Sequence, residues 1–291
     1  MNDRPKITQE MIAAYDEYTH LTLDRRRFME TLAKLSGSAA AAAAIAPLLA
    51  SNYALAEVVP ATDPRIKVEE VTYPASGADI KGYLVRPAEA SGKLPAVIVI
   101  HENRGLNPHI KDVTRRMALE GFIALGVDLL SRAGGTPGSD EEAGKLFQTI
   151  DRAALVPDAA AAIAYLKSLP DSNGNVGAIG FCFGGGLVNQ LAVASPDLKA
   201  GVAYYGGQPT EGVDKIKARL MLHYAGLDNR INAGIAGYEA ALKAAGVDYQ
   251  IFRYEGVNHA FNNDTSAQRY NKEAADLAWS RTIAFLKESL A

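Results

Sequence analysis

The sequence predicts an α/β fold, with a largely parallel central sheet and helices on both faces. Short apolar runs rich in Val, Ile, Tyr and Phe alternate with longer amphipathic segments, and most of the runs end in Gly, Asp or His. This alternation is typical of parallel strands joined by helices, and nearly unbroken apolar strands fit burial on both faces. Ligands bind at the carboxyl ends of the strands in such sheets, so the residues that follow each strand are the functional candidates.

The expected elements form one domain over residues 57–291. β-branched and aromatic residues mark the strands, and turn-forming residues bound them. We expect strands at 82–87, 95–102, 122–130, 175–182, 200–206, 219–226 and 249–256. We expect helices at 108–121, 140–150, 157–169, 184–195, 232–245 and 266–290. The sequence has no repeat of fixed period and no linker long enough to divide this domain.

Composition narrows the range of functions. The chain has 291 residues, a formal net charge of −3 and a single cysteine, Cys182. Near-neutral charge without a basic stripe argues against a nucleic-acid partner. One cysteine excludes an internal disulfide and a CxxC redox or zinc pair. The sequence contains no metal-ligand constellation and no cofactor motif, so we expect a small-molecule substrate, no metal and no cofactor.

Residues 1–56 are typical of an export signal. Arg25 and Arg26, followed by Phe28 and Met29, resemble a twin-arginine motif, although Glu30 stands where a lysine is usual. An apolar, alanine-rich segment follows and ends in the A-x-A cleavage pattern at 54–56. We therefore expect the twin-arginine machinery to be a partner of this leader and the mature chain to be periplasmic or secreted. The alternatives are a membrane anchor or an ordinary N-terminal helix, although the apolar segment is short for a membrane-spanning helix.

The region before the arginine pair is longer than a signal needs. Ile7, Met11, Ile12 and Tyr15 have the spacing of one helix face. This pattern indicates a structured leader or a surface for a partner.

Cys182 lies at the centre of the most informative motif. The pattern Gly180-x-Cys182-x-Gly184 follows an apolar strand and opens a helix, as in a nucleophile elbow that has cysteine in place of serine. Side chains at the two glycines would collide with the crossing strand and helix. The amides at the helix N-terminus favour the thiolate over the thiol. The alternative is a small buried core cysteine.

Two further residues complete a catalytic arrangement. His259 lies in a loop after the last strand, and Asp228 directly follows the preceding strand. The order of nucleophile, acid and histidine is that of α/β-hydrolases. His259 is expected to pair with the thiolate and later to activate water, while Asp228 fixes its tautomer. Asp248 and Asp264 are alternatives to Asp228, but neither directly follows a buried strand. The other histidines have weaker contexts, and His20 is expected to leave with the signal.

The segment after the strand at 95–102 is the expected oxyanion loop. The backbone amides of Asn103 and Phe183 are then placed to bind the developing oxyanion. Glu102 lies beside this site, where simple ester hydrolysis needs no acid, and the alternative is a solvated loop glutamate. His101 and Glu102 begin like a zinc-binding H-E-x-x-H motif, but Gly105 occupies its fifth position.

Five segments in order, HENRG, VDLLSR, GFCFGG, AGLD and NHAF, resemble the dienelactone hydrolase (carboxymethylenebutenolidase) family. The resemblance implies an α/β-hydrolase whose Cys-His-Asp triad opens an unsaturated lactone through a thioester. It also implies that Glu102 contacts the thiol and takes its proton, and that Arg132 holds the substrate carboxylate. The place of the family's second carboxylate-binding arginine is taken by Asn263, which favours neutral lactones or esters.

The sequence therefore predicts a thiol hydrolase of small esters or lactones. Two other functions are compatible with parts of the sequence. A thiol peroxidase or redox sensor needs a reactive cysteine, but usually also a second, resolving one. A non-catalytic binding protein could use the same scaffold, although it has no need of a complete triad.

Overall fold

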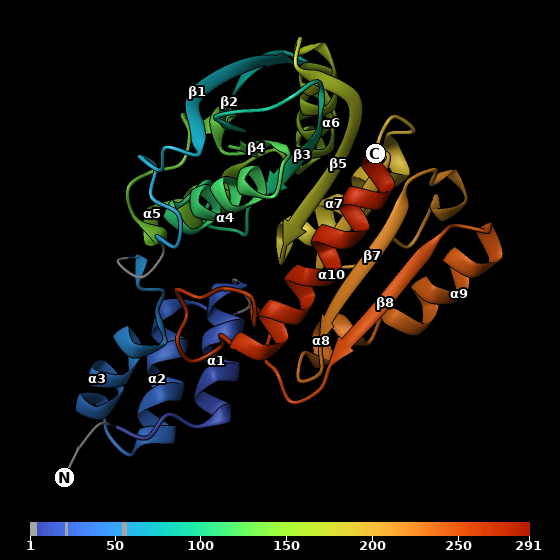
Figure 1. Ribbon diagram of the computed structural model, residues 1–291. Helices are drawn as coiled ribbons and strands as arrows, with labels where there is room; N and C mark the ends of the chain where they lie inside the picture. The colour runs from blue at the N-terminus through green and yellow to red at the C-terminus, as the bar shows by residue number, and fades with distance from the viewer. Residues whose placement is uncertain (1–4, 21–22, 54–56) are drawn as a thin grey trace.

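The computed structural model describes residues 5–20, 23–53 and 57–291. In these residues the strands form one eight-stranded sheet in the order β1-β2-β4-β3-β5-β6-β7-β8 (Figure 1). The strands are β1 (Ile66–Ala75), β2 (Ala78–Pro87), β3 (Leu94–Ile100), β4 (Ile123–Val127), β5 (Ser172–Phe181), β6 (Ala200–Tyr204), β7 (Arg219–Ala225) and β8 (Tyr249–Tyr254). The α-helices are α1 (Gln9–Thr19), α2 (Arg25–Ser36), α3 (Ala39–Leu49), α4 (Pro108–Leu119), α5 (Asp140–Thr149), α6 (Arg152–Ser168), α7 (Phe183–Ala194), α8 (Asn229–Asn232), α9 (Ile235–Ala245) and α10 (Lys272–Leu290).

The sheet confirms the predicted fold class. Strands β4, β3, β5, β6, β7 and β8 are neighbours in that order, and each adjacent pair is parallel. The pairs β1–β2 and β2–β4 are antiparallel. Strand β1 was missing from the prediction because it is an edge strand whose exposed positions carry charged residues. Such a strand lacks the apolar run that marks the central ones.

Helices cover both faces of the sheet, also as predicted. Apolar side chains of α4 and α10 pack on one face, and those of α6, α7 and α9 pack on the other. Two helix starts differ from the prediction. Helix α6 begins at Arg152 because Asp151 caps it and the helix continues through Pro157. Helix α10 begins only at Lys272, where Asn271 supplies the cap.

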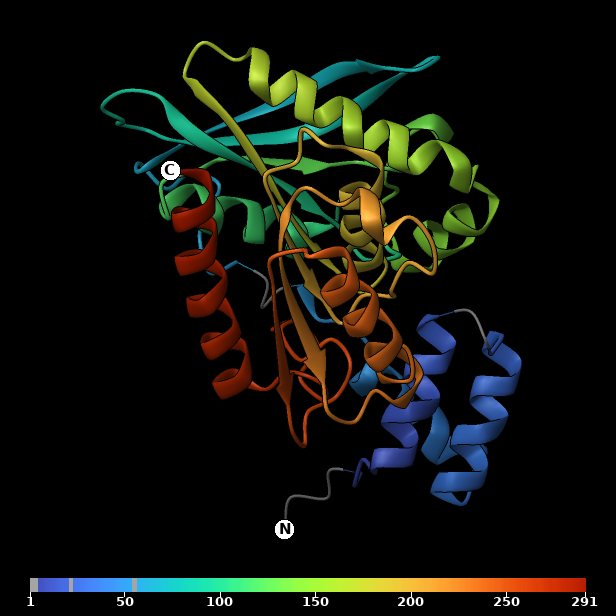
Figure 2. The same cartoon turned by 90° about the vertical axis from the view of Figure 1, so that its right-hand side faces the viewer.

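The N-terminal residues form a compact helical unit. Side chains of Thr8, Asp24 and Ser38 cap α1, α2 and α3. The predicted face with Met11 and Tyr15 exists in α1, and it packs against apolar side chains of α2 and α3. Figures 1 and 2 show these three blue helices together at the end of the sheet toward which the arrowheads of β7 and β8 point. The predicted cleavage site at 54–56 lies outside the described residues, so the division at residue 56 stays a prediction.

No single helix in the described ranges is long and apolar enough to cross a membrane. Helices α2 and α3 reach the necessary length and composition only as a pair, and the pair is bent by 112°.

Candidate active site

Cys182 lies at a strained turn between β5 and α7. Its backbone has a φ of 56°, in the left-handed region that non-glycine residues rarely adopt. A Cβ at Gly180 would lie 2.2 Å from the carbonyl oxygen of Gly184, and one at Gly184 would lie 2.4 Å from that of Ile100. Both contacts are with backbone atoms that cannot move aside cheaply. The two glycines therefore allow the turn that presents the thiol at the end of the sheet.

His259 and Asp228 meet as the sequence predicts. The Nδ1 atom of His259 lies 2.5 Å from Oδ2 of Asp228, and both side chains are buried. Burial alone would raise the pKa of Asp228, but the hydrogen bond and the charge of His259 outweigh it and lower that pKa. The other ring nitrogen, Nε2, is buried without a hydrogen-bond partner in the described part of the chain. One ring nitrogen of His259 lies within 4.8 Å of the Cys182 sulfur, and a ring nitrogen without a partner is what a general base requires.

The two alternative acids serve other partners. Asp248 forms an ion pair with Arg219 at 2.6 Å, far along the sheet from the thiol. Asp264 accepts a bond from Arg116 at 2.5 Å and lies 3.1 Å from Nδ1 of His109. Asp228 is therefore the acid that orients His259.

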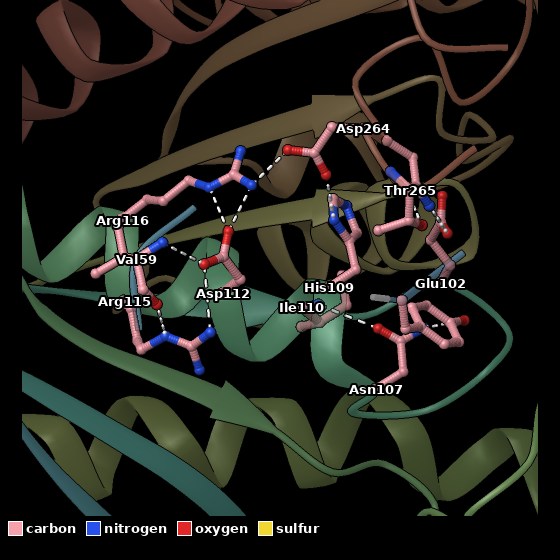
Figure 3. Close-up of polar contacts among 12 residues, drawn as sticks. Val59, Glu102, Asn107, His109, Ile110, Asp112, Arg115, Arg116, Asp264 and Thr265 are labelled. Atoms are coloured by element: carbon pink, nitrogen blue, oxygen red, sulfur yellow. Dashed lines mark hydrogen bonds and ion pairs between the residues drawn. The ribbon is translucent and has the colours of Figure 1, made fainter. Parts of the chain in front are cut away.

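Helix α4 holds the loop that carries His259. Arg116 bridges Asp112 on its own helix and Asp264 on the loop, each at 2.5 Å (Figure 3). Asp112 also accepts a bond from the backbone amide of Val59. Each aspartate of this network lies beside an arginine of opposite charge. The ion pairs therefore fix the loop without leaving a buried charge unpaired.

The expected oxyanion loop lies beside the elbow. Phe183 is the first residue of α7, and Asn103 and Phe183 line one cavity with Cys182. Glu102 and Cys182 line a second, small cavity, and the Glu102 carboxylate accepts a bond from Asn263 at 3.1 Å. The structure thus places Glu102 and Cys182 around the same small cavity.

His101, the residue before Glu102, has a structural position. It is fully buried, and its Nε2 accepts the backbone N–H of Leu129. Burial lowers the pKa of His101, which keeps it neutral as this acceptor.

Arg132 is not brought to this cluster. Its guanidinium forms two hydrogen bonds of 2.7 Å with the buried carboxylate of Asp158, and a third of 2.7 Å with the carbonyl of Ser76. Arg132 lines neither cavity around Cys182. The structure therefore places Arg132 away from the cavities around Cys182, because a bidentate partner on α6 holds its side chain. The carboxylate-binding role that the resemblance implies for Arg132 stays a prediction.

The structure adds a histidine that the sequence reasoning discounted. Nε2 of His20 lies 3.1 Å from Sγ of Cys182, and its Nδ1 contacts Asp16. Burial disfavours protonation of His20, but the charge of Cys182 and hydrogen bonds to Asp16 and Cys182 outweigh it and raise its pKa to about 9. One feature of the sequence indicated a structured segment near His20, namely the apolar helix face at 7–15. The resemblance of residues 1–56 to an export signal outweighed that feature in the prediction.

A cavity of about 300 Å³ is lined by Cys182 and His259. That volume is at the lower end for a small-molecule site. Phe147, Phe183 and Tyr205 contribute aromatic surface, and Arg152 and Arg230 add two positive charges. A larger cavity of about 640 Å³ lies between the N-terminal helices and α5, and none of the predicted catalytic residues lines it. Sequence reasoning missed both arginines, because they are exposed and belong to no motif.

The comparisons with known proteins agree with this site. The Dienelactone hydrolase family matches residues 80–290, more than half of the chain. A protein from Synechocystis named "Putative carboxymethylenebutenolidase" is 38% identical over 244 residues, which are 77% of this chain and 98% of that protein.

Solved structures give the same relationship. A putative dienelactone hydrolase from Klebsiella pneumoniae superposes with a TM-score of 0.68 at 29% identity, covering 76% of this chain and 98% of that one. A dienelactone hydrolase-like promiscuous phosphotriesterase, P91, from metagenomic libraries superposes with a TM-score of 0.70 at 26% identity, covering 78% and 100%. The chain belongs to the dienelactone hydrolase family and is a lactone or ester hydrolase.

Proposed function

We propose that this protein hydrolyses a small lactone or ester through a thioester on Cys182. The observation that carries the proposal is the ordered set at the carboxyl end of the sheet: a strained elbow at Cys182 and a His259 whose Nδ1 is held by Asp228 at 2.5 Å. An imidazole oriented in this way has its Nε2 available for proton transfer beside the nucleophile.

The chemistry proceeds in two halves. The thiolate attacks the carbonyl carbon, and the amides of Asn103 and Phe183 are proposed to bind the oxyanion. Collapse breaks the bond to the ester oxygen, which takes a proton and leaves, or remains tethered where a lactone is opened. Water, deprotonated by His259, then attacks the thioester and releases the acid. Glu102, which lines the small cavity with Cys182, is proposed to accept the thiol proton when substrate binds.

Hydrolysis of p-nitrophenyl acetate before and after iodoacetamide tests this function. We expect activity that iodoacetamide abolishes, together with an acetylated Cys182 in intact-mass spectra of rapidly quenched enzyme. Peroxide consumption without ester hydrolysis would favour a redox enzyme, and neither activity would favour a binding protein.

Charge in the 300 Å³ cavity favours an anionic substrate. Asn263, at the place of the second family arginine, is buried against Glu102 and Thr265. The positive charges come instead from Arg152 and Arg230. Neither has a carboxylate partner among the residues that the structure describes. The expected preference for neutral substrates therefore changes to a modest preference for a carboxylate.

Removing these arginines measures that preference. Because both side chains are exposed, each is worth about 2- to 5-fold in binding rather than the larger factor of a buried pair. Arg152→Ala and Arg230→Ala should each raise KM for a carboxylated lactone by that factor and leave KM for its methyl ester unchanged. Lys67→Ala, which removes one exposed positive charge from β1, is the control. Equal losses on acid and methyl ester would contradict an anion-binding role.

Export stays a prediction from the sequence. Arg25 and Arg26 are exposed, with 69% and 80% of their side-chain surface accessible. If the twin-arginine route operates, protein from the periplasm of the native host should begin at Glu57 or within a residue or two of it. Lysine at both arginine positions should then leave the full chain in the cytoplasm. Unchanged delivery of that variant would exclude the route.

A further inference from the structure

The N-terminal unit, defined as the described residues between 5 and 53, lies against the catalytic loops and outside the family match at 80–290. Its contacts reach two of those loops directly. The side-chain amide of Asn103 in the oxyanion loop donates to the carbonyl of Thr19. Gln9 and Asn258, the residue before the catalytic histidine, exchange side-chain hydrogen bonds. The unit therefore touches the residues on both sides of the reacting thiol.

Three further contacts attach the N-terminal unit to the rest of the protein. Arg269 is only 7% exposed, and its carboxylate partner among the described residues is Asp16, at 3.6 Å. The guanidinium also lies 5.1 Å from the ring centre of Tyr15. Near its other end, the Tyr53 hydroxyl donates to Asp140 at 2.7 Å. If the unit left, Arg269 would lose its ion pair and its aromatic contact together.

His20 brings a second histidine–carboxylate pair to the nucleophile. Its Nδ1 lies 2.7 Å from the carbonyl oxygen of Asp16 and 3.3 Å from the carboxylate of the same residue. Its Nε2 lies 3.1 Å from Sγ of Cys182. Its ring meets that of His259 edge-on, with centroids 4.6 Å apart. Two imidazoles, each oriented through Nδ1 by an aspartate, thus face one sulfur.

We propose that the N-terminal unit is a retained part of the active site and that His20 is a second catalytic histidine, which holds the thiolate of Cys182. This inference rests on the proposed function, in which Cys182 is the nucleophile. The unpartnered Nε2 of His259 supports it, because a sulfur already bonded to His20 leaves His259 free for water.

The two histidines then divide the proton transfers. At rest, the proton of the thiol lies on Nε2 of His20, which gives an imidazolium–thiolate pair. In this scheme His20 replaces Glu102 as the acceptor of the thiol proton, because His20 contacts the sulfur at 3.1 Å. After attack, the departing ester oxygen takes that proton from His20 and becomes a hydroxyl. In the second half, His259 takes a proton from water, and the hydroxide oxygen bonds to the thioester carbon. Collapse releases the thiolate and the carboxylic acid, and His259 passes the proton taken from water to Nε2 of His20, whose ring lies beside it. This restores the imidazolium–thiolate pair, and the sum of both halves is ester plus water giving alcohol plus carboxylic acid.

The charges around His20 support this resting state. Asp16 contacts His20 directly. The other titratable and charged groups around the two cavities that His20 lines are Tyr15, Tyr53, Glu102, Arg104, Asp140, Arg152, Cys182, Tyr205, Arg230, His259 and Arg269. Burial alone would raise the pKa of Asp16, but the charge of His259 and the bond and charge of His20 outweigh it and lower that pKa. Because the pKa of His20 is raised from 6.5 to about 9, its contribution to docking is complete below pH 6.5 and is lost as pH rises through 9. The N-terminal unit should accordingly become more sensitive to trypsin above that pH.

The ionisation of Cys182 tests the proposal on the full chain. Because the protein has one cysteine, the ultraviolet band of the thiolate reports this residue alone at pH values below tyrosine ionisation. An opposite charge at this distance lowers a pKa by about 1 to 3 units. His20→Gln should therefore raise the thiolate midpoint by about 1 to 3 units, while Gln9→Ala, which alters only the docking contact with Asn258, should leave it in place. Thermal melting checks that each variant is folded.

Three results would overturn the proposal. One is a wild-type thiol that stays protonated near neutral pH. The second is a midpoint in His20→Gln equal to that of the wild type, or a shift in Gln9→Ala of the same size. The third is active protein from the native host that begins at Glu57, since cleavage there removes His20. The first two readouts do not depend on turnover, so the proposed function fails separately, through esterase activity that survives loss of Cys182.

Discussion

Cys182→Ala should lower kcat/KM for p-nitrophenyl acetate by about 10³-fold or more. No other nucleophilic side chain occupies the elbow, and the chain has no second thiol to replace it. The oxyanion amides and the cavity remain in the variant, so a small residual rate above that of water is expected. Stopped assays with the purified full chain measure the loss, and circular dichroism confirms that the variant is folded.

Cys182→Ser is the matched variant, since it retains the shape of the elbow and an oxygen nucleophile. It should also be poor, because a serine hydroxyl needs stronger base assistance than a thiol. The ring nitrogen Nε2 of His20 lies 3.1 Å from the sulfur, and in the proposed resting state it is already protonated and is not available as that base. An alanine variant with near-wild-type esterase activity would show that Cys182 is a core cysteine and that the triad is wrongly assigned.

The chemistry of the site was predictable where a local motif carries it. The glycines around Cys182 specify a turn that the backbone contacts at Gly180 and Gly184 explain. Chain order placed Asp228 and His259 at the carboxyl ends of neighbouring parallel strands, where the sheet brings them together. These features depend on backbone geometry that recurs wherever the elbow is built, so sequence position alone is informative.

Side chains whose positions depend on distant partners could not be predicted. Arg132 turns toward Asp158, a pairing between a loop and α6 that no spacing indicates. His20 contacts Cys182 although the two residues are 162 positions apart in the sequence. The segment around His20 has a composition that fits an export signal as well as a helical unit packed on the active site. Arg152 at the start of α6 and Arg230 in α8 reach one cavity from helices that are distant in sequence. In each case the tertiary arrangement, rather than local propensity, decides where the charge lies.

The fold was likewise predictable where the local sequence pattern determines an element, and not where tertiary contacts do. Central strands and their helices were predictable because apolar runs and amphipathic segments differ in period. Edge strand β1 was not, since its charged outward positions resemble a loop. The N-terminal helices show how one pattern can serve two purposes. An apolar, alanine-rich segment fits an export signal, yet Ile45 and Leu49 of α3 pack against α1 and α2 in the structure.

Asp228→Asn should lower kcat by about 10²- to 10⁴-fold, and KM should fall with kcat because only hydrolysis of the thioester is slowed. The carboxylate accepts the Nδ1–H of His259 at 2.5 Å, which leaves Nε2 as the base toward water. An asparagine amide can present its N–H instead, which turns the ring to the tautomer whose Nε2 carries the proton. That tautomer cannot accept a proton from water, so hydrolysis of the thioester should fail before its formation does.

The step that fails distinguishes Asp228 from a merely structural residue. Asp228 also accepts the amide of Ile231 at the start of α8, and an asparagine oxygen can keep that bond. The variant should therefore fold, acylate with a burst of p-nitrophenol, and then accumulate the acetyl thioester in intact-mass spectra. Asp264→Asn alters the ion pairs behind the same loop. This variant should lower the melting temperature and leave the burst-to-turnover ratio close to that of the wild type. A variant of Asp228 that lost the burst and the steady state equally would place its effect in acylation, and would contradict the assignment of His259 as the base for water alone.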